Sequence, residues 1–213
     1  LQVDAVGYER KAIVRLSTYS GSVPMLIGTS DIHYGAWTHV AVTKSGTTWK
    51  LYVNGVAEAT VSTTAVLTIG GWLTIGGYYS GGTTGATGFL GYVSDFRLTQ
   101  GVNRYPTDFT PPTAALPGSG VVDTYYDMVV LHMHCDGEAG ELAYGDVKGH
   151  AVTPGGPPTH PSVTLSTSFS PVFGGSALFS GNVNNWLTTS SSDFDPADQD
   201  FCIEGWYGVP AST

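Results

Sequence analysis

The chain is long enough to bury a full hydrophobic core, but it is poor in charge. It has 213 residues, of which 41% are hydrophobic and only 12% are charged, and its formal net charge is −9 with eight Lys and Arg residues. Soluble domains usually contain about 25% charged residues, and surfaces that bind nucleic acid or anionic lipid present clusters of positive charge. Binding to nucleic acid is therefore not expected. Membrane insertion is not expected either, because no apolar run approaches the roughly 20 residues of a spanning helix.

The first part of the sequence predicts a meander of short strands. Residues 36–43 are rich in β-branched and aromatic side chains, and residues 48–53 alternate between two faces of a strand. Asn54 and Gly55 follow, and because both tolerate positive φ they predict a tight hairpin turn to a partner strand at 56–61. The alternation places Trp49, Leu51 and Val53 on one face and Thr48, Lys50 and Tyr52 on the other.

Proline and glycine divide the rest of the chain. Residues 107–124 include Pro111, Pro112 and Pro117 and predict a linker, and the similarly rich segment 150–161 is expected to be loop. A single helical turn is expected near 195–198. Many short strands with frequent turns favour an all-β sandwich or jelly roll. Strands are expected at 8–18, 23–27, 72–75, 89–98, 128–135, 151–153, 163–166, 176–180, 185–189 and 200–207.

Several motifs follow one another as they do in a known domain family. Residues 37–44 (WTHVAVTK) and 51–55 (LYVNG), followed by 74–77, 89–97 and 105–112, resemble the C-terminal half of a laminin-G-like (LamG) domain of the concanavalin A-like lectin/glucanase superfamily. The segments 130–137, 173–179 and 200–206 resemble the N-terminal half of the same domain. The resemblance implies an antiparallel β-sandwich, the concanavalin A-like jelly roll.

The two halves stand in the reverse of the family's order. Residues 1–112 resemble the C-terminal half, 113–124 form a Pro/Gly linker, and 125–213 resemble the N-terminal half, so that together they make about one domain. The sandwich is then either circularly permuted within one chain or completed by strand exchange with a neighbouring subunit. In both cases each apolar sheet face must meet a complementary half. The strand-like start, with no initiator Met or signal peptide, fits a fragment, a processed product or one piece of an array.

Two groups of residues are candidates for metal binding. Asp136 and Asp146 resemble acidic loop positions of the family, which implies a calcium site completed by loop carbonyls. The alternative is that these carboxylates stabilise glycine turns through hydrogen bonds to the backbone. His132 and His134 share a strand face with Asp136, and two imidazoles with one carboxylate form a zinc ligand set, although such pairs are more often packed or solvent-facing.

Catalytic residues are not expected. The family's glucanases carry their carboxylates in a Glu-x-Asp-x-x-Glu-like arrangement on one strand, and that motif is absent here. Glu204 stands alone on its strand and is expected to be a structural acceptor, and His39 is expected to be structural too. Cys135 and Cys202 form either one disulfide bridge or two buried thiols.

Exposed aromatic residues are the remaining candidates for ligand binding, because sugar rings stack on Tyr and Trp. The pairs Tyr78-Tyr79 and Tyr125-Tyr126 lie in or beside expected loops and are predicted to contact a ligand or partner. The five tryptophans lie in expected strands and are predicted to pack in the core: Trp37, Trp49, Trp72, Trp186 and Trp206.

These observations favour a non-catalytic, lectin-like binding or adhesion module over an enzyme. Its partners are expected to be glycans or glycoproteins and neighbouring copies of itself. The surface rich in Thr, Ser and Gly suits an extracellular or virion-surface setting, such as a phage tail, a virion appendage or a bacterial surface protein. The alternative is a structural repeat subunit of an extracellular fibre or decoration layer.

Overall fold

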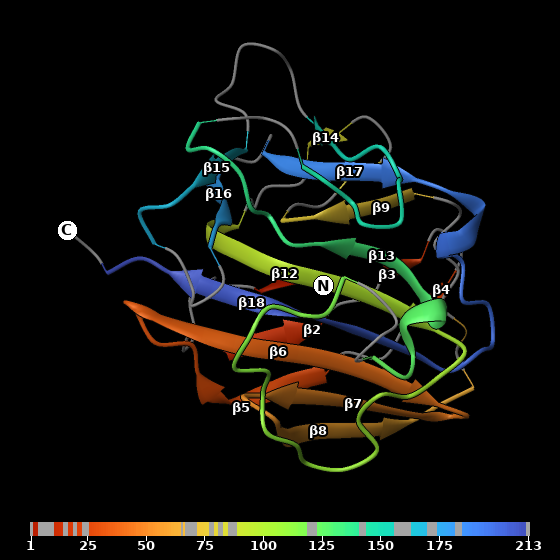
Figure 1. Cartoon of the computed structure of the whole chain (residues 1–213). Helices are drawn as coiled ribbons and strands as arrows, with labels where there is room; N and C mark the ends of the chain where they lie inside the picture. Colours follow the sequence, from red (N-terminus) through yellow and green to blue (C-terminus); the bar gives the residue numbers. More distant parts are fainter. Residues whose placement is uncertain are drawn as a thin grey trace.

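A computed structural model gives the fold (Figure 1). Its described residues are 2–3, 11–14, 17–18, 21–22, 26–64, 66, 72–76, 79–80, 83–84, 89–118, 123–140, 144–155, 163–169, 174–181 and 185–211. The elements are β1 (Gln2–Val3), β2 (Lys11–Val14), β3 (Ser17–Thr18), β4 (Gly21–Ser22), β5 (Leu26–Asp31), β6 (Ala36–Ser45), β7 (Thr48–Val53), β8 (Val56–Ser62), β9 (Trp72–Ile75), β10 (Tyr79–Ser80), β11 (Thr83–Thr84), β12 (Leu90–Gln100), η1 (Tyr126–Met128), β13 (Val129–Met133), β14 (Thr153–Gly155), β15 (Thr164–Ser166), β16 (Ser176–Ser180), β17 (Trp186–Ser190), η2 (Ser192–Phe194) and β18 (Phe201–Val209).

One large antiparallel sheet organises the molecule. Its strand order is β15-β16-β12-β18-β6-β7-β8, and β13 also pairs with β12. The meander β6-β7-β8 is joined by the Asn54-Gly55 turn, where both residues have positive φ as predicted. Strand β18 lies between β6 and β12, so strands from the two ends of the chain share this main sheet. The predicted all-β antiparallel fold is confirmed.

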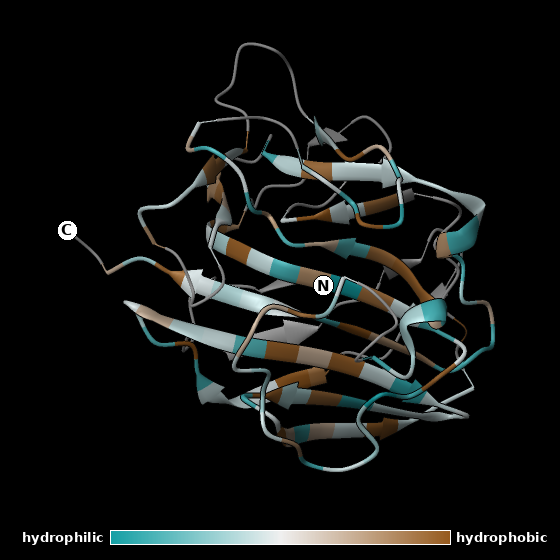
Figure 2. Ribbon diagram, in the orientation of Figure 1, coloured by the Kyte–Doolittle hydropathy of each residue, from teal (hydrophilic) through white to brown (hydrophobic). Residues whose placement is uncertain are grey.

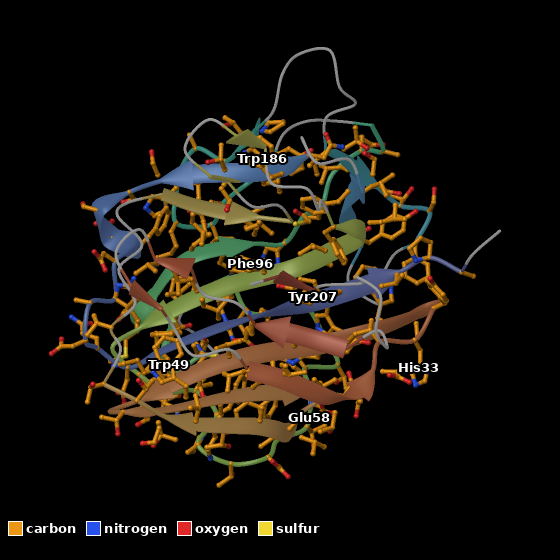
Figure 3. The ribbon with its side chains drawn as sticks, turned by 180° about the vertical axis from the view of Figure 1, so that it is seen from behind. His33, Trp49, Glu58, Phe96, Trp186 and Tyr207 are labelled. Carbon is orange, nitrogen blue, oxygen red and sulfur yellow. The ribbon has the colours of Figure 1, made fainter. Side chains whose placement is uncertain are left out.

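Further strands cover one face of the main sheet. The sheet β1-β2-β5 approaches it through β5, which contacts β7 and β8, and Figure 3 shows β2 and β5 in front of the main sheet when it is seen from behind. A third sheet, β14-β17-β9, lies beyond β13 (Figure 1). Large apolar side chains fill the core, among them Trp49, Phe96, Phe179, Leu187, Phe201 and Tyr207.

Alternation along the strands creates this core. Hydrophobic and hydrophilic residues alternate along β12 in Figure 2, and Trp49 on β7 packs edge-on against Phe201 on β18 with ring centroids 5.1 Å apart. Of the tryptophans predicted to pack in the core, Trp49 and Trp186 are buried, and Trp37 and Trp206 are partly buried. The side chain of Trp72 lies outside the described residues.

The segment predicted to be a linker packs on the opposite face of the main sheet. Residues 101–118, here called the strap, contain no regular secondary structure and pass in front of β6 and β18 in Figure 1. The backbone N–H of Phe109 donates to the carbonyl of Gly55 at 2.9 Å, and the hydroxyl of Tyr52 donates to the carbonyl of Tyr105 at 2.7 Å. Tyr52 is therefore fully buried although it lies on the face away from the core.

Three strand ranges agree with the sequence analysis, and the other ranges differ by one or more residues; β5, expected at 23–27, is Leu26–Asp31. Strands β7, β9 and β16 match their predicted ranges residue for residue. The prediction of loop throughout 150–161 is wrong, because β14 includes Pro154; this strand lies at a sheet edge, where a residue without an N–H is tolerated. The helical turn is η2, which lies just before the predicted 195–198 and begins after a Ser191 cap.

The two cysteines do not form a disulfide bridge. Cys135 and Cys202 are separate buried thiols, and burial raises the pKa of Cys135 to about 12.

Within the described residues, no helix has the length and apolarity that a membrane span requires.

Gly55 gives a test of how the strap is held. A Cβ on Gly55 would lie 1.9 Å from the carbonyl oxygen of Phe109, whereas a Cβ on Gly46, which also has positive φ, would meet nothing within 4 Å. We expect Gly46→Ala to lower the free energy of unfolding by about 1–2 kcal/mol, the cost of left-handed backbone. Gly55→Ala should cost about 3–4 kcal/mol, because the strap must also move. Urea unfolding measures both, and equal losses would show that the strap is not held at this turn.

Candidate functional site

The face of the main sheet beneath the strap is polar but buried. Strand alternation directs Ile203 of β18 into the core and directs its neighbours Cys202 and Glu204 toward the strap. Glu204 pairs with Arg97 of β12, so their side chains meet on the same face. Charged groups in such a place need partners, because burial without a partner is costly.

An ion-pair network supplies these partners. Arg97 donates to Glu204 Oε1 through Nη2 at 2.6 Å and through Nε at 3.0 Å, and its Nη1 donates to Asp123 Oδ2 at 3.0 Å. Arg104 donates to both oxygens of Asp123, at 2.9 and 3.0 Å. The hydroxyl of Tyr105 donates to Glu204 Oε2 at 2.6 Å. The network therefore ties the strap to β12 and β18.

Glu204 is held as a carboxylate at the centre of the network. Burial alone raises the pKa of Glu204, but His39, whose Nε2 lies 3.4 Å from Oε2, and the Arg97 guanidinium outweigh it and lower that pKa to about 2. The side chains of His39 and Glu204 are fully buried. The prediction that Glu204 is a structural acceptor is confirmed.

A second cluster lies on the same face where β12 and β13 pair. Asp95 has φ 53° at an irregularity in the pairing of β12 with β18, and its Oδ1 lies 2.7 Å from His134 Nδ1 and 3.3 Å from His132 Nε2. Its Oδ2 accepts a hydrogen bond of 2.7 Å from the backbone N–H of Leu116 in the strap. One donor atom from each of Asp95, His132 and His134 lies within 4.8 Å of the others.

The three side chains differ in their electrostatic state. Burial raises the pKa of Asp95, but the bonds to the two imidazoles outweigh this and lower that pKa below its usual value. The same Asp95 raises the pKa of His134, whereas burial lowers the pKa of His132. The cluster therefore combines a carboxylate, a buried neutral imidazole and a more basic imidazole at the edge.

The predicted acidic residues do not come together at this cluster. His132 and His134 share a face as predicted, with ring centroids 4.2 Å apart. Cys135 has φ 57°, which turns the chain before Asp136, and Asp136 is exposed. Asp95 stands where the sequence analysis expected Asp136. The one feature of the sequence that could have indicated Asp95 is an aspartate inside the otherwise strand-like segment 90–100. The sequence does not show which residues this aspartate contacts.

Asp146 has a structural role in the hydrogen-bond pattern. Its Oδ1 accepts from the backbone N–H of His132 at 2.7 Å, and its Oδ2 accepts from the backbone N–H of His150 at 2.9 Å and lies 2.6 Å from that residue's Nδ1. Calcium needs six to eight oxygen ligands. Calcium binding at Asp136 and Asp146 stays a prediction.

The predicted aromatic residues are described only in part. Tyr125 is 37% exposed, and the guanidinium carbon of Arg104 lies 5.5 Å from the centre of its ring. Tyr126 is partly buried, with Nζ of Lys148 4.4 Å from its ring centre. Tyr78 and the side chain of Tyr79 lie outside the described residues. Ligand binding at these four tyrosines stays a prediction.

Comparison with protein families found one match. Residues 5–102 match the laminin-G profile of the concanavalin A-like lectin/glucanases superfamily. No curated protein and no solved structure matched the chain. The match covers the meander β6-β7-β8 and all of β12, including Asp95 and Arg97, whereas the partners Asp123, His132 and Glu204 lie outside it.

The ion-pair network predicts a specific dependence of stability on pH. Because the pKa of Glu204 is lower in the folded chain than its ordinary 4.5, its stabilising effect is complete above about pH 4.5 and is lost as pH falls toward 2. We expect Glu204→Gln to lower the free energy of unfolding at pH 7 by about 3–5 kcal/mol, since Arg97 loses a buried partner. The fall in stability between pH 4.5 and 2 should also become shallower.

Chemical unfolding from pH 2 to 7 measures both effects. Glu138→Gln, at an exposed glutamate, is the matched control and should leave the profile unchanged. An unchanged acid limb in Glu204→Gln would exclude Glu204 as the titrating group.

Proposed function

Since residues 5–102 belong to the concanavalin A-like lectin/glucanases superfamily, we propose that the chain is a non-catalytic binding or adhesion module that recognises glycans or glycoproteins. The proposal places it outside the cell or on a virion surface, for example on a phage tail, a virion appendage or a bacterial surface protein. The low content of charged residues, 12%, is consistent with a surface that recognises neutral polar groups.

The state of the buried carboxylates supports binding over catalysis. Glycoside hydrolysis by paired carboxylates needs two such groups flanking the scissile bond, one of them a general acid with a raised pKa. Glu204 and Asp123 instead share Arg97, and the pKa of each is lowered. Both side chains lie beneath the strap with less than a tenth of their surface exposed, so a sugar does not reach them.

The turn around η1 is the observation that carries the proposal. Tyr125 and Tyr126 occupy adjacent positions beside exposed Met128, and Lys148 lies over the ring of Tyr126. Aromatic rings offer apolar faces for the C–H surface of a sugar, and the neighbouring carbonyls and cations offer groups for its hydroxyls. This combination fits a shallow glycan-binding surface.

The topology supports a self-contained module over a subunit that a neighbour must complete. The strands that flank β18 are β6 and β12 of the same chain, and the polar face is covered by the chain's own strap. The edge strand β8 is also engaged, since the backbone N–H of Ala57 donates to Asp108 of the strap at 2.9 Å. Assembly with neighbouring copies, as in a fibre or decoration layer, is the alternative that the experiment below separates.

Binding of the whole chain to a glycan array, followed by titration calorimetry with the strongest ligand, tests the proposal. We expect Tyr125→Ala and Tyr126→Ala to weaken binding about tenfold or more each, the cost of losing one aromatic anchor. Tyr78→Ala and Tyr79→Ala test the other predicted pair in the same assay. The matched control is Tyr34→Ala, at a tyrosine of similar exposure (43%) beside β6.

The outcomes separate the alternatives. An array without signal, together with elution of the chain as a large assembly, would reject the binding module in favour of a structural subunit. Release of sugar from a β-glucan would instead establish an enzyme. Equal weakening by Tyr34→Ala would exclude the η1 turn as the binding surface.

A further inference from the structure

We propose that Asp95, His132 and His134 form a binding site for one divalent transition-metal ion, and that zinc is the ion whose preferences the site fits best. The site lies on the covered face of the main sheet and is independent of glycan recognition.

The donor set selects the class of metal. The site offers two imidazole nitrogens and one carboxylate oxygen, His132 Nε2, His134 Nδ1 and Asp95 Oδ1. Zinc binds His nitrogen and Asp oxygen at about 2.0–2.2 Å, whereas calcium and magnesium prefer shells made of oxygen. The set therefore suits zinc and its neighbours in the first transition row.

The spacing of Asp95 Oδ1 from each imidazole nitrogen is close to what zinc requires. Two ligands about 2.05 Å from a tetrahedral zinc stand roughly 3.3 Å apart. The distance from His132 Nε2 to Asp95 Oδ1 is 3.3 Å, and that from His134 Nδ1 to the same oxygen is 2.7 Å. The three donor atoms lie within 4.8 Å of one another, so the two imidazoles must shift for one ion to bind all three and to replace the protons that these atoms share.

The ligands are held before the ion arrives. Arg97 pairs with His132 across β12 and β13, and the two-residue spacing puts His134 on the same face. Asp95 adopts φ 53°, a left-handed conformation that few residue types other than glycine, asparagine and aspartate adopt readily, and its carboxylate lies against the two rings. The N–H of Leu116 fixes the second carboxylate oxygen, as outer-shell donors do for metal ligands.

The burial of His132 also supports a metal site. The His132 side chain has no exposed surface, and its Nδ1 has no hydrogen-bond partner among the described residues. Asp95 is therefore the only polar group that a described hydrogen bond gives to this imidazole. The nitrogen directed at Asp95, Nε2, is therefore the His132 atom that is placed to act as a metal ligand.

The fourth coordination position lies on the side of His134. This side chain is 22% exposed, whereas the other two are at most 1% exposed. The strap approaches here, because a Cβ on Gly118 would lie 3.5 Å from His134 Nε2. Three protein ligands with one accessible position leave room for water or for an oxygen or nitrogen of a bound partner.

The pair His150 and Asp146 offers a matched control within the same chain. Its Nδ1 to Oδ2 distance is 2.6 Å and His150 is 17% exposed, so it resembles His134 and Asp95. A further carboxylate, Asp193, lies 3.7 Å from the opposite ring nitrogen, so within the described part of the chain no third ligand converges with the first two. His150 and Asp146 therefore reproduce the His–Asp contact of the proposed site but not its set of three ligands.

Metal uptake by the whole chain tests the proposal. The chain is dialysed against a chelator, loaded with zinc and passed through a gel-filtration column, and bound zinc is measured by mass spectrometry. We expect one zinc per chain, and a rise of the thermal midpoint by about 5–10 °C when free zinc is 100-fold above its Kd. Cobalt in place of zinc should give the visible absorption of a low-coordinate site.

Substitutions then locate the ion. His134→Gln and Asp95→Asn should each weaken zinc binding by at least about 100-fold, and His150→Gln should leave it unchanged. If a variant does not fold, histidine ring NMR on the unsubstituted chain decides instead: zinc should shift the nitrogen signals of His132 and His134 and leave that of His150 in place. Absence of stoichiometric zinc in the unsubstituted chain, or equal loss in His150→Gln, overturns the proposal.

Discussion

The buried ion pair between Arg97 and Glu204 is the interaction on which the arrangement of the strap and its neighbours depends. The two groups lie on adjacent strands, one from the middle of the chain and one from near its C-terminus, on the face that points away from the apolar core. Charges in that position require both a cover and further partners, because each ion loses its hydration. The strap and the segment after it provide them through Tyr105, Arg104 and Asp123.

This requirement decides where a ligand is able to bind. A sheet face that holds a strap over a charged network is not available to a sugar, so the binding surface that we propose lies at the rim, where Tyr125 is exposed. The same residue is joined to the network, since Arg104 lies over its ring and donates to its carbonyl. The proposed binding turn therefore rests on the ion-pair network rather than on a free loop.

The metal site that we infer uses the same covered face. Asp95 and Arg97 both lie on β12, and both bind the segment that follows this strand, through Leu116 and Asp123 respectively. The sheet thus carries two polar clusters. In one, arginines neutralise the buried carboxylates. In the other, two imidazoles contact one carboxylate, that of Asp95, among the described residues. That difference, rather than the presence of histidine, distinguishes a structural network from a ligand set.

Local sequence patterns determined several strands and the hairpin turn, because alternation and turn chemistry act over a few residues: β7, β9 and β16 have their predicted bounds, and the Asn54-Gly55 turn has positive φ. The pairing of His132 with His134 followed from the same two-residue period. Tertiary structure alone decided that Asp95 rather than Asp136 joins them, and that Glu204 meets Arg97 across 107 residues of sequence. Such partners depend on strand order and on where the strap lies, and neither the period of a strand nor the composition of a linker specifies them.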